Sequence, residues 1–412
     1  MNSKLCVSIV LSATLLFSCS QDNGNDPIND PQGSGLIDTP VSYVFTRNGE
    51  SSVSYSGQIT RLAQSDELYS ALNSESEFST LDLMFNGNAD GNSAGFSDPE
   101  LNGTTKIIGS KTSSSALAGS AAIKVKFDDM ISDFSNNVVP NWNVDAAPGT
   151  PGVISSPDGS SSYNVNAMGQ EIDQTFFKGL IGAFTLDQII NNYIHPNQLD
   201  SGSRRADNDN DILDGDSNYT EMEHKWDEAF GYLYGHDDPG DTSTFGSEPS
   251  GSGNLLMKYL EKVDAADGYD PGIGQTVYDA FILGRTAIVN KDYELRDQQA
   301  NIIKVELSKI IGYYAIHYMN DYVLKLSSGN LAGALHSISE GHGFIRSLQY
   351  TNTGNDIPFM SKDVVEYFLE NYMPNFYNID PAVFMAPIEA PYPGMIALIK
   401  QAFEANGVTL NI

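Results

Sequence analysis

The feature that most constrains the fold is a run of apolar residues at helical spacing between residues 299 and 326. Apolar side chains recur there every three or four residues, so one face of a single long helix must be buried against other helices. The same spacing covers residues 166–194. We predict further helices at 60–73, 117–136, 219–235, 254–265, 275–290, 330–349, 361–372 and 392–406. The pattern predicts an all-α fold of one or more antiparallel helix bundles.

The segments between several of the predicted helices are long and polar. Residues 86–116, 137–163, 195–218 and 236–253 are rich in Gly, Ser, Asn, Asp and Pro, which is typical of surface loops. A different pattern precedes the first helix, where aromatic and β-branched residues alternate on both sides of Arg47-Asn48-Gly49-Glu50. An Asn-Gly pair in such a setting favours a tight turn between two strands. We therefore expect one small N-terminal β-hairpin and long acidic surface loops.

The N-terminus has the pattern of an export signal. Lys4 is its only early charge, and the apolar run at residues 7–17 has the length of a signal-peptide core but is too short to span a bilayer. The run ends in Leu16-Phe17-Ser18-Cys19, which resembles the bacterial lipoprotein signal, in which the cysteine is acylated. We predict a signal peptide over residues 1–18 and a lipid anchor at Cys19. The alternative is an ordinary secretory peptide.

Beyond the anchor, we expect a flexible polar tether over residues 19–38 and a single large helical domain over 39–412, with two sub-bundles as an alternative division. The acidic stretch after Cys19 resembles the signal that takes Bacteroidota lipoproteins to the outside of the outer membrane. We therefore expect a protein of the outer membrane that faces the cell exterior. The chain has only two cysteines, Cys6 and Cys19, and loses Cys6 with the signal peptide, so no internal disulfide can form.

The charge balance limits the possible partners. The chain has 53 acidic residues and 22 basic ones, a formal net charge of −31. Binding to nucleic acid without sequence preference requires clustered Lys and Arg, so we exclude it. The sequence also has no His-Glu-x-x-His, phosphate-binding Gly-Lys-Ser/Thr or Cys-x-x-Cys motif. These absences favour a binding protein over an enzyme.

The predicted helix at 219–235 is the first candidate site. One of its sides is apolar, while another presents an imidazole and two carboxylates about one turn apart, from His224, Asp227 and Glu228. The same side continues as Gly231 and Gly235, which are unfavourable within a helix unless another chain segment packs closely. We therefore expect this side to be covered. The sequence allows two interpretations, a ligand or metal site and a buried polar cluster that only fixes helix packing.

The predicted helix at 330–349 is the second candidate site. His342 falls on its apolar stripe between two glycines, and Arg346 follows one turn later, so that a carboxylate or another anion could pair with it. His336 and Glu340 share a different face, four residues apart. A histidine of the packed core is the alternative for His342.

The loop before residue 219 is a candidate calcium site. Aspartates alternate along it as they do in loops that surround Ca²⁺ with oxygen ligands. The run resembles an EF-hand loop but has Ile212 in place of the glycine and Asn218 in place of the final glutamate. A solvated acidic loop is the alternative. The candidate ligands are Asp207, Asp209, Asp211, Asp214 and Asp216.

Two resemblances add to this interpretation. The helices at 219–235 and 330–349, together with the hairpin region and its Gly57-Gln58-Ile59-Thr60-Arg61 segment, resemble an uncharacterised domain family of Bacteroidota surface lipoproteins. More distantly, His224-Lys225-Trp226-Asp227 resembles the Gly-x-His-x-x-Glu motif of imelysin-like proteins, with Met222 at the glycine and Asp227 at the glutamate. The second resemblance implies an all-helical protein of iron uptake, for some relatives of which peptidase activity has been proposed.

Three functions follow as hypotheses. The first is a lipid-anchored surface binding or accessory protein for iron or haem uptake, partnered by a TonB-dependent receptor, with its site on the helices at 219–235 and 330–349. Iron or zinc would then be a cofactor or cargo, alongside calcium in the acidic loop. The second is a metal-dependent hydrolase of peptidase type in which Asp227 or Glu228 is the general base. The third is a glycan-binding or protein-binding partner of an outer-membrane transporter.

Overall fold

A computed structural model describes residues 36–74, 76–115, 120–235 and 255–412. The signal peptide, Cys19, nearly all of the tether and the predicted loop at 236–253 lie outside these residues. Within them, Ile37–Ile412 form one compact unit. No helix in this described part is long and apolar enough to cross a bilayer.

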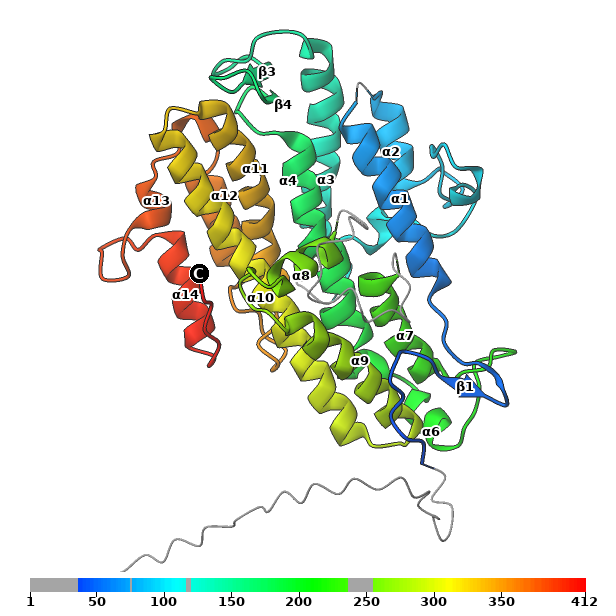
Figure 1. Ribbon diagram of the computed structural model, residues 1–412. Helices are drawn as coiled ribbons and strands as arrows, with labels where there is room; N and C mark the ends of the chain where they lie inside the picture. Colours follow the sequence, from blue (N-terminus) through cyan, green and yellow to red (C-terminus); the bar gives the residue numbers. More distant parts are fainter. Residues whose placement is uncertain (1–35, 75, 116–119, 236–254) are drawn as a thin grey trace, which may run out of the picture. The chain divides into compact units, whose positions relative to one another are not determined.

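Three helices form the centre of the fold. They are α4 (Ile172–Leu180), which continues in π-helical winding as η5 (Ile181–Tyr193), α10 (Tyr293–Ser327) and α11 (Leu331–Ser347). Figure 1 shows them side by side, and α11 packs against both α4 and α10. A turn at Gly329, whose φ is +79°, reverses the chain between α10 and α11 and makes them antiparallel. The two longest apolar patterns of the sequence thus lie in the core, as predicted.

A second group of helices packs against this centre. It contains α7 (Glu221–Tyr234), α8 (Leu256–Asp264) and α9 (Ile273–Val289), with α1 (Ser56–Leu72) against α7. The remaining predicted helices are present as α3 (Ser120–Asp133), α12 (Lys362–Tyr372) and α14 (Met395–Glu404). The helices that the sequence analysis missed are short: α2 (Phe78–Asn86), α5 (Pro196–Leu199), α6 (Arg204–Asp209) and α13 (Ala382–Met385).

The N-terminal hairpin is confirmed. Strands β1 (Thr46–Arg47) and β2 (Glu50–Ser51) pair antiparallel, with Thr46 opposite Ser51. Asn48 and Gly49 both have positive φ, as the tight turn requires. A second antiparallel pair is formed by β3 (Gly152–Ser155), which lies in the predicted loop at 137–163, and β4 (Ser162–Val165), which begins at the end of that loop. The fold is therefore mostly helical with two small sheets, one more than predicted.

Candidate functional site

Helix α7 begins at a capping motif that can be recognised in its sequence. Thr220 accepts a hydrogen bond from the backbone N–H of Glu223, and the Glu223 carboxylate accepts one from the N–H of Thr220, which is a capping box. Trp226 is fully buried, and its indole N–H donates to the Phe281 carbonyl of α9 at 2.9 Å. A Cβ atom added to Gly231 would lie 2.4 Å from Cβ of Tyr55. The expectation that this side of the helix is covered is confirmed.

Two carboxylates of α7 belong to a buried ion-pair cluster centred on Arg285 of α9, here called the Arg285 cluster. The Arg285 guanidinium donates to Asp227 and to Glu223, each at 3.0 Å, and all three side chains are fully buried. Tyr43 donates to Asp227 at 2.7 Å, and Arg47 donates to Glu223 at 2.9 and 3.0 Å. Burial raises the pKa of Asp227 to about 6, although the Arg285 charge acts in the opposite direction. The hydrogen-bond donors around Asp227 thus serve to stabilise the fold.

His224 and Glu228 lie near Asp227 but are held by other partners. The His224 ring stacks on Tyr219, and its Nδ1 is 3.0 Å from the Ser54 carbonyl, a distance at which the ring N–H donates to it. Burial holds the pKa of His224 below its usual value. Glu228 accepts from Lys225 at 2.6 Å and lies 4.0 Å from His224 Nε2. The backbone of Ser54 links His224 to the Arg285 cluster, because its carbonyl faces the His224 ring while its N–H donates to Asp227 at 3.2 Å.

The candidate calcium ligands are spread over the loop. Asp207 and Asp209 lie in α6, where Asp209 accepts from Tyr293 at 2.6 Å. Asp211 forms an ion pair with Lys291 at 3.0 Å, while Asp214 and Asp216 are exposed. Among the residues that the structure describes, no three Asp, Glu, His or Cys side chains are placed to hold one metal ion.

His342 and Arg346 lie on the side of α11 that faces α12. His342 is buried against Phe376, with ring centroids 5.6 Å apart, and burial together with the Arg346 charge holds its pKa well below the usual value. Arg346 Nε is 3.7 Å from Glu366, which is an ion pair and too long for a hydrogen bond. None of these contacts involves the surroundings of His224, so the two histidines have separate environments.

The opposite side of α11 carries a connected set of charged groups that we call the α11 charge cluster: Glu171, Lys178, Tyr318, His336 and Glu340. His336 Nδ1 is 2.6 Å from Glu171, and its Nε2 is 3.5 Å from Glu340. Lys178 Nζ lies 3.4 Å from Glu340, to which Tyr318 also donates at 3.0 Å. Carboxylates thus face both nitrogens of the imidazole, an arrangement that favours its protonated form.

The electrostatics of this cluster differ from those of the Arg285 cluster. Burial opposes the positive charge of His336, but its hydrogen bond to Glu171 and the two glutamate charges raise its pKa above the usual value. Burial and the charge of Glu171 raise the pKa of the neighbouring Asp173 to about 7. The His336 side chain is still 24% exposed and stacks on Tyr163 at 4.4 Å. The cluster therefore lies beside a carboxyl group with a pKa of about 7 and contains an imidazole that solvent reaches, a combination typical of functional sites.

Close packing of α4 against α11 brings Lys178 to Glu340. A Cβ atom added to Gly343 would lie 2.4 Å from Cβ of Lys178 and 2.6 Å from the backbone N of Gly179. The glycines beside His342 thus serve helix packing, as their cost within a helix indicates. The sequence analysis missed Glu171 and Lys178, although Glu171, Gln174 and Lys178 recur at helical spacing on an otherwise apolar helix.

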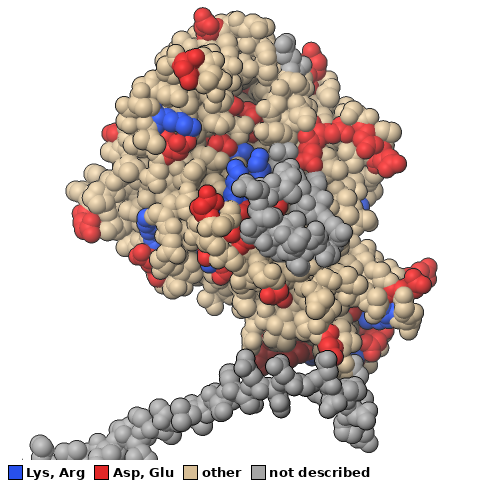
Figure 2. Space-filling view, viewed as in Figure 1, with Lys and Arg blue, Asp and Glu red and all other residues tan. Residues whose placement is uncertain are grey.

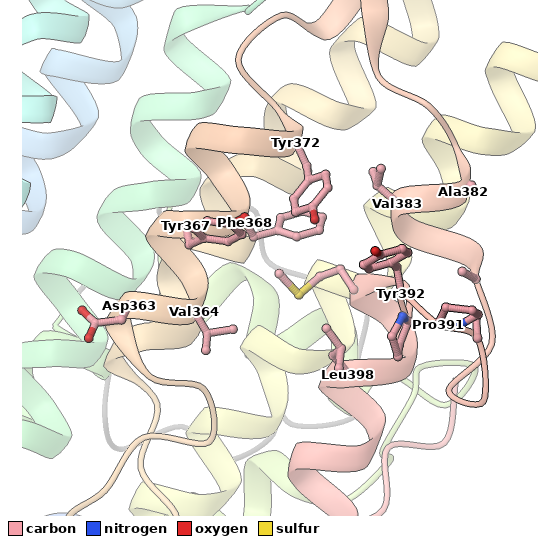
Figure 3. Close-up of a pocket in the computed structure, with 14 residues that line it drawn as sticks. Asp363, Val364, Tyr367, Phe368, Tyr372, Ala382, Val383, Pro391, Tyr392 and Leu398 are labelled. Atoms are coloured by element: carbon pink, nitrogen blue, oxygen red, sulfur yellow. The ribbon is translucent and has the colours of Figure 1, made fainter.

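A groove between α12 and the α13–α14 segment has a volume of about 720 Å³. We call it the tyrosine groove, because Tyr367, Tyr372 and Tyr392 line it and are 60%, 40% and 84% exposed. Figure 3 shows Tyr372 of α12 and Tyr392 of the facing loop on opposite sides, with Asp363 at the edge. Its other walls are apolar.

The fold and these sites define a largely helical protein with buried charge clusters and an open aromatic groove. The chain belongs to the DUF4856 family, a domain of unknown function, whose model matches residues 40–381. No curated protein and no solved structure matches it. The expected membership of an uncharacterised domain family is thus confirmed, and α13 and α14, one wall of the tyrosine groove, lie beyond the matched residues.

Proposed function

We propose that this chain is a lipid-anchored binding protein of the outer cell surface that serves iron or haem uptake together with a TonB-dependent receptor. The anchor is Cys19, and the imelysin-like motif at His224 supports the link to iron. The ligand site in this proposal is the α11 charge cluster. The candidate residues of α7, by contrast, serve the packing of α7 against α9 and the hairpin.

One observation carries this choice of site. In the α11 charge cluster the His336 imidazole lies between Glu171 and Glu340, with 24% of its side chain exposed. Apolar residues can often replace a buried ion pair without loss of stability, so stability alone does not explain why such a cluster is present. A charge cluster that solvent still reaches is therefore a candidate for ligand binding. Imidazole and carboxylate are also ligands that iron accepts. His336 would have to turn to present them together, because the three groups now bind one another.

The first prediction tests this site with ferric nitrilotriacetate and with hemin. We expect the purified chain to bind at least one of them and His336→Ala to weaken that binding at least about tenfold, because the imidazole is central to the cluster. Absorbance titration measures hemin binding, and elemental analysis after gel filtration measures iron.

His224→Ala is the matched control. It also removes a partly buried histidine from a helix, but one outside the α11 charge cluster, whose ring stacks on Tyr219, donates to Ser54 and lies 4.0 Å from Glu228. We expect it to bind as the wild type does. Binding of neither probe by the wild type contradicts the iron assignment, and equal losses in both variants contradict the placement of the site.

The tyrosine groove favours a second function, the binding of a neutral glycan on behalf of a transporter. Its open aromatic faces suit the C–H faces of sugar rings, and its phenols supply hydrogen bonds. No Lys or Arg lines it, so nothing in the groove selects an anionic chain.

The second prediction therefore concerns Tyr392. Loss of an aromatic face that is 84% exposed should remove stacking without disturbing the core, so we expect Tyr392→Ala to weaken glycan binding about fivefold or more and to leave stability unchanged. A glycan array on the wild type followed by calorimetry on both proteins measures this. Tyr163→Ala, which removes a tyrosine outside the groove, is the control. An array without any bound neutral glycan contradicts the proposal.

A further inference from the structure

Two lysines of α8, Lys258 and Lys262, lie beside the α11 charge cluster. Lys258 and Lys262 are one helical turn apart and half-buried, and neither forms an ion pair within the described part of the chain. Tyr259, between them in sequence, packs its ring on Tyr314 and Phe344 of α10 and α11. The ring of Tyr259 thus brings α8 against the cluster.

The ammonium groups converge on that ring. Nζ of Lys262 lies 5.2 Å from the centroid of the Tyr259 ring, and Nζ of Lys178 lies 5.5 Å from the same centroid. Burial and the positive charges of Lys178 and Lys262 lower the pKa of Lys258. Burial likewise lowers the pKa of Lys262. Three lysines therefore share a partly desolvated region and repel one another.

The carboxylate of Glu340, which acts on both lysines, is already in use. Glu340 accepts from Tyr318 and pairs with Lys178 through one oxygen, while its other oxygen faces His336. Within the described part of the chain, Lys178 and His336 pair with Glu340 and Glu171, and neither Lys258 nor Lys262 forms an ion pair, which gives this region a local surplus of positive charge.

This surplus is unusual in a chain with a net charge of −31. On the face shown in Figure 2, acidic side chains are spread widely, and a group of basic ones lies near the middle. Half-buried cations that repel one another lower the stability of the fold. The binding of an anionic ligand would offset this cost. A ligand with two negative charges would neutralise both α8 lysines.

We propose that Lys178, Lys258 and Lys262 bind the carboxylates or the phosphate of an anionic ligand with at least two negative charges. This inference rests on the proposed function and deepens it, because it names the ligand chemistry of the same site. Haem, which carries two carboxylates, is one such ligand, and a carboxylate chelate of iron is another.

The third prediction tests this site by calorimetry on the purified chain at low ionic strength, where charge interactions are least screened. Inorganic phosphate and citrate are the probes, and their relative affinity separates a phosphate site from a carboxylate site. We expect the Lys258→Met and Lys262→Met double variant to bind the preferred anion at least about tenfold more weakly. We expect Glu340→Gln to bind it more tightly, because a competing carboxylate is lost.

The control removes the same charge elsewhere. Lys124→Met with Lys291→Met breaks two partly exposed ion pairs, with Asp128 and Asp211, and should leave anion affinity unchanged. The inference is overturned if the wild type binds neither anion, if the control loses as much affinity, or if Glu340→Gln binds more weakly. Iron or hemin binding that depends on His336, with no binding of either anion, overturns this inference alone. Anion binding without iron or hemin binding overturns the iron assignment and keeps the anion site.

Discussion

Arg285→Met should be among the most destabilising single substitutions in this chain, with an expected loss of about 3–5 kcal/mol in the free energy of unfolding. Arg285 is fully buried and donates to Glu223 and Asp227, which are also fully buried. Without the guanidinium, Glu223 keeps its ion pair with Arg47, whereas Asp227 keeps only hydrogen bonds from Tyr43 and Ser54. The substitution therefore leaves a buried carboxylate without a positive charge. Urea unfolding followed by circular dichroism measures the loss.

Two comparisons separate this effect from a general loss of packing. Asp227→Asn removes the carboxylate that Arg285→Met leaves unpaired, so the double variant should be more stable than Arg285→Met alone. Lys124→Met breaks the partly exposed pair with Asp128 and should cost about 0.5 kcal/mol. A cost for Arg285→Met as small as that of Lys124→Met would contradict the interpretation.

The sequence contains a signal for the buried position of Arg285. Arg285 follows Phe281 by four residues and precedes Ile288 by three, so it falls on the apolar stripe of α9. A permanently charged residue on such a stripe requires a buried acid, and α7 offers Glu223 and Asp227 one turn apart. What the sequence does not contain is the pairing itself, because periodicity says which face is buried but not which helix covers it.

The same limit explains the outcome for the candidate sites. Apolar spacing correctly placed most long helices, since it is a local property of each segment. The glycines also correctly indicated close contacts, at Gly231 with Tyr55 and at Gly343 with Lys178. The chemistry around His224 and His336, however, depends on residues far away in the chain, such as Ser54 and Glu171. The short second hairpin was missed because its strands are brief and its Ser-, Gly- and Pro-rich segment resembles a loop.

Gly343→Ala should destabilise the chain by about 1–3 kcal/mol, even though alanine is the better helix former by about 1 kcal/mol. The new methyl group would lie 2.4 Å from Cβ of Lys178 and 2.6 Å from the backbone N of Gly179, so α4 and α11 would have to separate. Separation also moves Lys178 away from Glu340, which are 3.4 Å apart. Urea unfolding measures the stability.

Gly341 supplies a control two residues away in the same helix. Its added methyl group would lie 3.2 Å from Cβ of Tyr318, a distance that a small adjustment relieves, so Gly341→Ala should be close to neutral because the gain in helix propensity offsets the adjustment. Both variants change the same residue type on α11, and only the distance to the neighbouring chain differs. Equal stability of Gly343→Ala and Gly341→Ala would contradict a contact in which an added Cβ at Gly343 lies 2.4 Å from Cβ of Lys178. Helices α4 and α11 would then be farther apart, and the position of Lys178 in the α11 charge cluster would change with them.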